Sequence, residues 1–135
     1  DEYLSNSTRI PATYVDPFAG QNYNTKLSTI TVKWDEKATK EEKQERIIIQ
    51  KWIANWMLGN EAWADYRRTG YPHLIPATDE GNKSGGIVDS QRGARRMPYP
   101  NEEYTSNLEN VNYAVANYLK GPDNMSTDVW WACKK

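Results

Sequence analysis

The chain has 135 residues, one domain's worth of polypeptide, which excludes a large multidomain enzyme. Seventeen Lys and Arg residues against 18 Asp and Glu residues leave a formal net charge of -1, without the cationic excess of a nucleic-acid-binding protein. The mean hydropathy is -0.90, and the sequence has no run of about twenty apolar residues of the kind a transmembrane helix needs.

Cysteine and histidine occur once each, as Cys133 and His73. A single cysteine cannot form an intramolecular disulfide, and these two residues alone cannot make a zinc site of the usual ligand types. The sequence therefore predicts neither a metal site nor a cofactor site.

The aromatic residues are six Trp and nine Tyr against one Phe, so nearly every ring carries an N–H or O–H group. Such rings suit surfaces that are partly exposed to solvent. They can be structural side chains whose polar ends reach solvent or backbone, or they can be platforms on which sugar rings stack. The structural role is the expected one for any single ring, because large aromatic side chains are mostly buried on average.

The N-terminal part of the chain predicts a loop and one strand. The first residues lack the basic and apolar regions of a signal peptide, and residues 5–24 are rich in Ser, Asn, Thr, Pro and Gly. Residues 29–34 alternate polar and apolar side chains and predict a half-buried strand. Its partner in a small strand pair is expected at residues 86–89 or 95–99.

Three helices are predicted. The first runs from Lys40 to Leu58, because Thr39 and Glu42 form a capping-box pattern and Gly59 can close the C-terminus. Its apolar side chains cover about half of its circumference, so a broad face must be covered.

The second predicted helix spans residues 61–68, with Asn60 as its N-cap and Gly70 at its end. Residues 73–93 are polar and rich in glycine and predict a surface loop, and residues 95–100 contain two prolines and predict an extended course. The third helix spans residues 108–118, begins at Ser106 or Asn107, and ends before Gly121.

Candidate catalytic groups are weak. The chain offers the adjacent carboxylate pairs Glu102-Glu103, Asp79-Glu80 and Asp35-Glu36, but neighbouring side chains on a loop or strand diverge, and such pairs are common on surfaces. A Cys133–His73 nucleophile pair would lie at the C-terminal end, where no scaffold lowers the thiol pKa. We therefore expect a protein that is not an enzyme.

Two hexapeptides resemble each other: residues 67–72 (RRTGYP) and 95–100 (RRMPYP). The paired arginines could clamp an acidic ligand. They could instead bind buried carboxylates such as Glu61 or Glu103 while stacking on tyrosines, and we favour this structural interpretation because helix C-termini attract arginine.

An ordered series of motifs resembles the C-terminal part of the SusD/RagB family. The motifs are Trp52, GNEAW at 59–63, YRRTGYP at 66–72, RRMPYPNEEY at 95–104, Asn107, Asn110-Val111 and Trp130-Trp131. Residues 10–17 and 30–34 resemble the same family, so the likeness covers nearly the whole chain.

The resemblance implies a mainly α fold, with long loops and one small strand pair, in which residues 1–135 form a single SusD-like C-terminal domain. Members of the family are outer-membrane nutrient-binding lipoproteins, several times longer than this chain. They contain tetratricopeptide-like helix pairs and deliver glycans or peptides to a SusC-like TonB-dependent transporter. The resemblance therefore implies a non-catalytic glycan-binding and uptake component, exposed at the surface of the outer membrane.

The sequence defines the ligand and the binding residues less closely than it defines the family. Weak candidates for ligand contact are Tyr71, Tyr99 and Tyr104, which lie on or beside predicted loops where a ring can face solvent. The alternatives are a fragment of a carbohydrate-active enzyme that uses Glu102 or Glu103, and an interaction module that touches only the transporter through residues 73–93. Self-association through apolar helix faces at Trp52, Trp56 and Trp63 is also expected.

Overall fold

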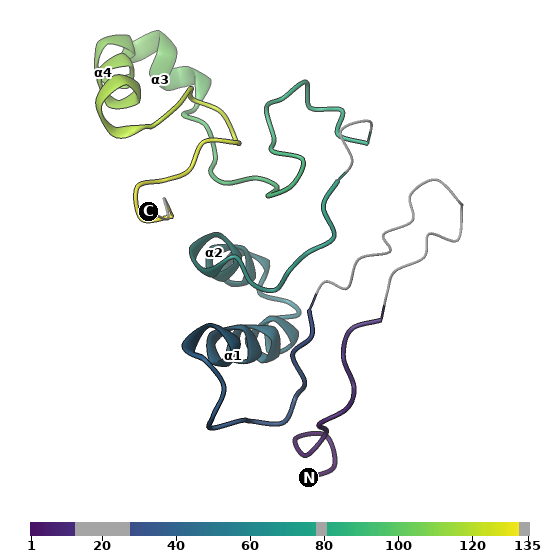
Figure 1. Ribbon diagram of the computed structural model, residues 1–135. Helices are drawn as coiled ribbons and strands as arrows, with labels where there is room; N and C mark the ends of the chain where they lie inside the picture. The colour runs from purple at the N-terminus through teal and green to yellow at the C-terminus, as the bar shows by residue number, and fades with distance from the viewer. Residues whose placement is uncertain (13–27, 78–80, 133–135) are drawn as a thin grey trace. The chain divides into compact units, whose positions relative to one another are not determined.

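The computed structural model describes residues 1–12, 28–77 and 81–132, and within these ranges its regular elements are four helices (Figure 1). The predicted mainly α fold is confirmed. The chain divides into two compact units, Asp1–Ile75 and Pro76–Lys135. Unit 1 contains α1 (Lys40–Ala54) and α2 (Gly59–Thr69), and unit 2 contains α3 (Asn101–Ser106) and α4 (Leu108–Tyr118). No helix in the described ranges is long and apolar enough to cross a membrane.

Helix α1 begins as predicted and ends earlier. The Thr39 hydroxyl accepts the Glu42 backbone N–H at 3.2 Å, and the Glu42 carboxylate accepts the Thr39 backbone N–H at 2.8 Å. These bonds form the capping box expected from the sequence. The helix ends at Ala54, four residues before the predicted Leu58, and Gly59 is the first residue of α2 rather than the closing residue of α1.

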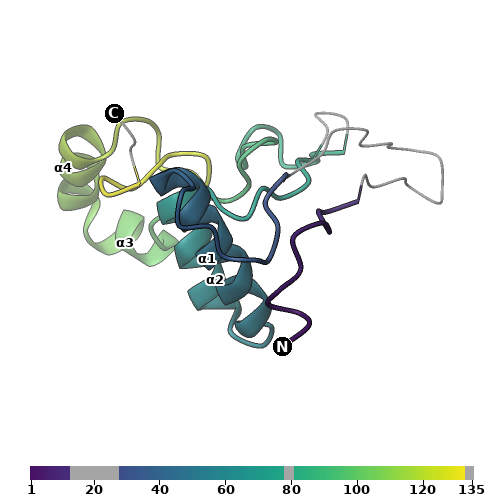
Figure 2. The same ribbon diagram turned by 60° about the horizontal axis from the view of Figure 1, so that its bottom comes forward.

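Helix α2 starts two residues before the predicted position, with Leu58 rather than Asn60 at its N-cap. Gly70 ends it as expected: its φ of 82° is left-handed, and its backbone N–H donates to the Tyr66 carbonyl at 2.7 Å. Helices α1 and α2 lie side by side (Figures 1 and 2), and their buried apolar residues are Ile48 and Ala62.

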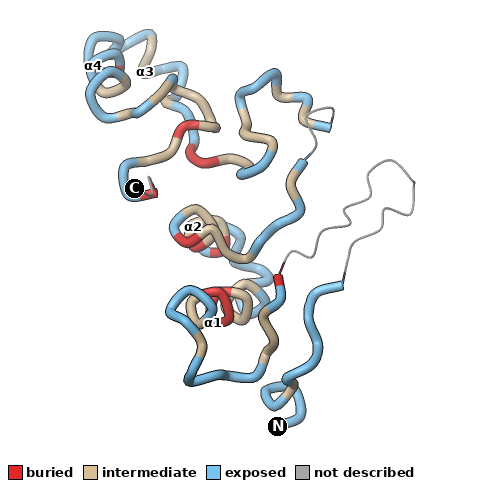
Figure 3. Tube along the Cα trace, in the orientation of Figure 1, coloured by how far each residue is buried: buried red, intermediate tan, exposed pale blue. Residues whose placement is uncertain are grey.

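The interior of unit 1 is largely polar. Buried Asp65 forms an ion pair with Lys51 of α1 at 2.6 Å and accepts a hydrogen bond from Arg68 at 2.8 Å. Buried Glu45 accepts the Ser28 hydroxyl at 2.6 Å. The buried positions of α1 and α2 are visible in Figure 3.

In unit 2, α4 confirms the third predicted helix, with Asn107 as its N-cap and Val111 as its buried residue. Helix α3 was not predicted, because the prolines at 98 and 100 suggested only an extended segment. Pro100 stands at the N-cap in an extended conformation (φ -61°, ψ 150°), and Glu102 and Glu103 follow in the first turn, where carboxylates are favourable.

The predicted strand pair is not found in the described part of the chain. Residues 28–34 form no strand, and the Thr31 carbonyl accepts a hydrogen bond from the Arg46 side chain at 2.9 Å instead of joining a sheet. The candidate partner segments 86–89 and 95–99 form no strand either, and the isolated bridge of the described chain joins Asp89 and Gly93. Residues 32 and 33 form a bend, so the alternating pattern does not lead to a regular strand here.

Candidate functional site

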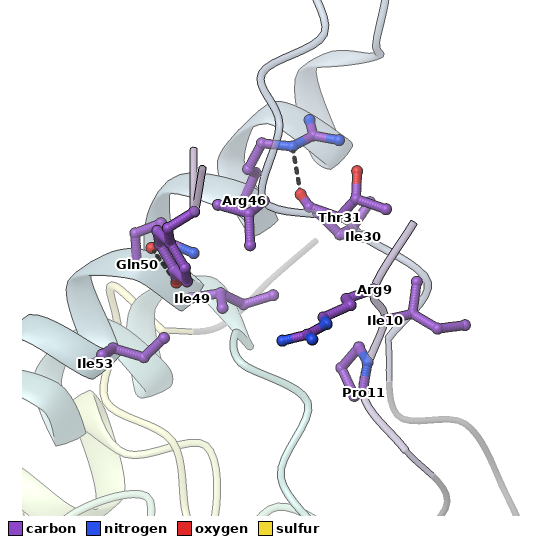
Figure 4. A pocket seen from close by; sticks show the side chains of 11 residues that line it. Arg9, Ile10, Pro11, Ile30, Thr31, Arg46, Ile49, Gln50 and Ile53 are labelled. Carbon is purple, nitrogen blue, oxygen red and sulfur yellow. Dashed lines mark hydrogen bonds between the residues drawn. The ribbon is translucent and has the colours of Figure 1, made fainter. Parts of the chain in front are cut away.

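Unit 1 contains a pocket of about 190 Å³ between α1, residues 30–32 and the N-terminal segment (Figure 4). Its walls are mainly aliphatic. They are formed by Ile10, Pro11, Ile30, Val32, Ile49 and Ile53, with Tyr3, Arg9, Thr31, Arg46 and Gln50 at polar positions. At one side of the pocket the Tyr3 hydroxyl donates to Gln50 Oε1 at 2.9 Å.

Two arginines line this pocket. The Arg9 side chain points into it between Pro11 and the α1 isoleucines (Figure 4), and no carboxylate of the described chain forms an ion pair with Arg9. Arg46 is buried; its Nε donates to the Thr31 carbonyl, and its Nη1 has no hydrogen-bond partner among the described residues. The pocket is therefore cationic at its polar positions and can accept an anionic group.

Sequence reasoning did not find this pocket. The apolar face of α1 was recognised, but Arg9 and Pro11 fell in a stretch interpreted as a plain loop. The one usable signal was the apolar character of Ile30 and Val32, which both line the pocket. Thr31 between them lines it too and Trp34 does not, so the predicted alternation of faces is not observed.

Tyr71, the first predicted ligand contact, is half-buried in unit 1, where its ring meets His73 edge-on with centroids 5.0 Å apart. Burial raises the pKa of the Tyr71 hydroxyl, and the nearby carboxylates Glu45 and Glu41 raise it further. Tyr71 does not line the described pocket.

Tyr99 and Tyr104 lie together in unit 2 around Asp123. The Asp123 carboxylate accepts the Tyr104 hydroxyl at 2.6 Å and the Tyr99 backbone N–H at 3.0 Å, and it pairs with Arg96. The hydrogen bond to Asp123 raises the pKa of Tyr104. The Arg96 guanidinium lies 5.0 Å from the centre of the Tyr99 ring.

Asp123 holds this cluster together as an ionised group. Burial raises its pKa, but hydrogen bonds from Arg96, Tyr104 and the Tyr99 backbone outweigh burial, and the net pKa lies below the usual value of 3.8. The side chains of Asp123 and Arg96 are only 7% and 8% exposed, so the ion pair is a buried one. We call Arg96, Tyr99, Tyr104 and Asp123 the Asp123 cluster.

A second cluster, in which Arg95 is buried and Arg92 is exposed, surrounds Asp128. Its carboxylate accepts Arg95 Nε at 2.7 Å and Arg92 Nη1 at 2.6 Å, and Arg92 also pairs with Asp89 at 2.9 Å. Burial raises the pKa of Asp128, but the two arginines outweigh it and the net pKa is lowered.

The arginines of both hexapeptides are thus structural, as expected. Arg95 and Arg96 bind Asp128 and Asp123, Arg68 binds Asp65, and the Arg67 guanidinium lies 3.7 Å from the centre of the Trp63 ring. The expected carboxylates were wrong: the partners are three aspartates rather than Glu61 or Glu103. Their sequence positions, up to 33 residues away, gave no local signal.

The candidate catalytic residues Glu102 and Glu103 have different hydrogen-bond partners. Glu103 accepts the Asn107 side chain at 2.9 Å, whereas Glu102 is exposed and its backbone carbonyl accepts the hydroxyls of Thr105 and Ser106. The described ranges contain no group of three or more His, Cys, Asp or Glu side chains that could hold a metal ion. Cys133, Asp79 and Glu80 lie outside the described residues.

Comparison with known proteins places these features in a family. The family model described as SusD-like, Susd and RagB outer membrane lipoprotein, matches residues 1–132. No curated protein gives a significant match.

Several solved structures are similar to the chain. A SusD homologue from Bacteroides uniformis is 71% identical over 98% of this chain, with a TM-score of 0.91. A SusD homologue from Bacteroides ovatus is 46% identical over 98% of the chain (TM-score 0.81), and a chitin-binding SusD homologue from Flavobacterium johnsoniae is 42% identical over 99% (TM-score 0.84).

The matched region is a limited part of these relatives, since the chain spans 27% of the B. uniformis and F. johnsoniae proteins and 28% of the B. ovatus protein. The resemblance deduced from the ordered motifs is nevertheless confirmed by the family model and by the high identity to SusD homologues of known structure. The chain belongs to the SusD/RagB family of outer membrane lipoproteins.

Proposed function

We propose that this chain is part of a non-catalytic glycan-binding component that takes up nutrients together with a SusC-like TonB-dependent transporter at the exposed face of the outer membrane. The observation that carries the proposal is the family match over residues 1–132, together with 42% identity to a homologue described as chitin-binding. The proposal concerns the longer family architecture, of which the chain spans about a quarter.

Within that architecture we assign this region a supporting role. Most polar side chains that the sequence offered for recognition are used internally, since the hexapeptide arginines bind aspartates and the Tyr104 hydroxyl binds Asp123. Tyr71, Tyr99 and Tyr104 remain our candidates for ligand contact, because each ring is only half-buried and can still offer a face to a sugar.

Four aspartates of the described chain are unsuited to act as a general acid. A general acid needs a raised pKa, whereas the pKa values of Asp65, Asp89, Asp123 and Asp128 are all lowered because hydrogen bonds from basic side chains or backbone N–H groups outweigh burial. Such carboxylates suit structural ion pairs.

A glycan array tests the proposal with two proteins: this chain, and a chimera in which it replaces the matching segment of the 71%-identical B. uniformis homologue. We expect the chimera to bind one or more glycans, with chito-oligosaccharides as the first probe, and the chain alone to bind none. Binding by the chain alone would assign a site to the tyrosine-bearing loops. No binding by either protein would reject the glycan role.

Two further measurements separate the alternatives. Turnover of any bound glycan that is lost in the Glu103→Gln variant would favour the enzyme. Loss of transporter association on deletion of residues 73–93, without any glycan binding in the parent protein, would favour the module that contacts only the transporter.

We also propose that the isolated chain self-associates through exposed apolar side chains. Of the three tryptophans expected on this surface, Trp56 is 83% exposed, whereas Trp52 and Trp63 are half-buried. The surface is therefore centred on Trp56 and its neighbours Met57 and Leu58, which are 86% and 60% exposed.

A further inference from the structure

The outward face of α4 carries aromatic and amide side chains rather than aliphatic ones. Six positions of the helix lie within about 160° of its circumference, and all six are exposed. They are Glu109, Asn110, Asn112, Tyr113, Ala116 and Asn117. Val111, the buried residue of α4, lies on the opposite side, and Figure 3 shows most of the helix as exposed. We call these six residues, together with Tyr118 at the end of the helix, the α4 tyrosine face.

The composition of this face suits contact with solvent. A helix face that packs on further polypeptide carries aliphatic residues at intervals of three and four, whereas none of the six positions holds Val, Ile, Leu or Met. Covering Glu109 or Asn112 with protein would also cost the free energy of desolvating their polar groups. The face is therefore suited to a hydrated ligand rather than to a buried contact within a longer protein.

Two tyrosine rings on this face hold each other in place. Tyr113 and Tyr118 are 59% and 65% exposed, and their rings meet edge-on, with centroids 5.9 Å apart and an interplanar angle of 78°. Each ring thus restrains the other, although more than half of each side chain is open to solvent. A ligand that stacks on restrained rings immobilises little further side-chain freedom.

Hydrogen-bonding groups next to the rings are not used by the protein. Among the described residues, the hydroxyls of Tyr113 and Tyr118 have no hydrogen-bond partner, in contrast to the Tyr104 hydroxyl, which donates to Asp123. Asn117 Nδ2 donates to the Tyr113 carbonyl at 2.7 Å. This bond fixes the amide beside the ring and leaves its Oδ1 able to accept another hydrogen bond.

This combination of groups fits a neutral sugar. An aromatic face stacks on the C–H groups of a pyranose ring, and neighbouring amides and hydroxyls bind the sugar hydroxyls. Glu109 is the only charged residue of α4, so the face offers no cation to an acidic glycan. It also offers no large aliphatic side chain to a peptide.

We propose that the α4 tyrosine face is a glycan contact, in which a pyranose ring of a neutral glycan stacks on the Tyr113–Tyr118 pair and its hydroxyls bind Asn117. This contact rests on the proposed glycan-binding function and lies outside the three tyrosines considered there. One open face binds weakly, so the isolated chain stays silent on an array. In the longer architecture the face adds affinity as one of several contacts along a glycan chain.

Nuclear magnetic resonance tests the contact directly in the unsubstituted chain. Titration with the hexamer of N-acetylglucosamine should shift the ring signals of Tyr113 and Tyr118, with a Kd on the order of 1 mM. The signals of Tyr3, an exposed tyrosine of unit 1, serve as an internal control and should stay in place. Ring signals of Tyr113 and Tyr118 that do not move at millimolar sugar would overturn the proposal.

Variants separate stacking on this face from contact with any exposed ring. Tyr113→Ala should weaken binding of the hexamer about tenfold, and Tyr113→Phe should retain most of it because the ring is kept. Alanine favours the helix, so α4 should persist, and circular dichroism checks this. Trp130→Ala is the matched control, since Trp130 is 80% exposed, lies in unit 2 and is not part of the face. Equal weakening by Tyr113→Ala and Trp130→Ala would contradict the site.

The choice of a neutral ligand is tested with an oligomer of galacturonic acid in the same titration. Tighter binding of this acidic oligomer than of the neutral hexamer would overturn the assignment. The proposed function fails separately, because it is rejected when the chimera binds no glycan on the array, whereas the titration of the isolated chain decides the α4 contact.

Discussion

At the scale of single residues, ionised aspartates decide how unit 2 is held together. Asp123 and Asp128 each receive buried arginine side chains from the segment 95–96, and the aspartates lie 27 and 33 residues further along the chain. Burying an arginine is costly without a counter-charge, so each pair is stable only as a complete unit.

Removing one partner should therefore be strongly destabilising. Asp123→Asn leaves the Arg96 guanidinium buried without a counter-charge, and we expect a loss of about 3 kcal/mol in the free energy of unfolding. Urea denaturation of the two proteins measures the difference. Asp35→Asn is the control, since Asp35 is exposed and Asn can still accept the Lys37 backbone N–H. Equal stability of the Asp123 and Asp35 variants would contradict the importance of the buried pair.

The same carboxylates predict a pH dependence. The pKa values of Asp89, Asp123 and Asp128 are lower in the folded chain than their usual value of 3.8, so the folded state binds fewer protons than the unfolded state near that pH. Their stabilisation is complete above the unfolded pKa and is lost as the pH falls through it toward the lower folded value.

We therefore expect the free energy of unfolding to fall as the pH is lowered from about 5 to 2. Urea titrations at several pH values measure how steeply the free energy of unfolding changes with pH. Asp89→Asn should make the slope shallower, because it removes one titrating group while an oxygen remains to accept the Gln91 and Arg92 backbone N–H groups. A slope that is unchanged in this variant would exclude Asp89 as a contributor.

At the scale of elements, the sequence predicted which segments are helical more accurately than where the helices begin and end. The capping box at Thr39 and the left-handed Gly70 are local signals, and both were correct. The end of α1 depended on how residues 55–58 pack, which no local pattern specifies. Helix α3 was missed because proline was taken as a helix breaker, whereas Pro100 stands at the N-cap, where its missing N–H costs nothing.

The glycines at the two ends of α2, Gly59 inside its first turn and Gly70 after its last, should respond oppositely to replacement by alanine. Gly70→Ala places a side chain at a φ of 82° and should cost about 1 kcal/mol. Gly59 lies in the first helical turn, and a Cβ added there would have no atom within 4 Å. Gly59→Ala should therefore stabilise the folded chain by up to about 1 kcal/mol. Thermal denaturation of both variants measures whether each substitution raises or lowers the stability. A destabilising Gly59→Ala would show that this position needs glycine for another reason.

The candidate site was only partly predictable for a similar reason. The pattern at 30–34 identified Ile30 and Val32 as apolar side chains that the fold uses, but the predicted strand did not form, and the Thr31 carbonyl binds the distant Arg46 side chain instead. Arg9 carries no signal in the sequence, because its importance arises from a pocket formed by three separate segments.

At the scale of the whole molecule, exposed apolar surface dominates. Trp56, Met57 and Leu58 are 83%, 86% and 60% exposed, so association that covers their apolar surface is favourable. We expect the sedimentation coefficient of the isolated chain to rise with concentration, and Trp56→Ser to reduce that rise. A monomer at all concentrations, without binding of a dye for apolar surfaces, would contradict self-association.

The described chain has four buried apolar residues, Ile48, Ala62, Val111 and Ala132, against eight buried polar or charged ones, and none of its large side chains is fully buried. The heat capacity of unfolding rises with exposed apolar area and falls with exposed polar area. Calorimetry should therefore give a heat capacity increment below the usual value of about 12–15 cal/mol/K per residue. The stability of this chain would then vary with temperature along an unusually flat curve, so that cooling protects it little and warming weakens it gradually.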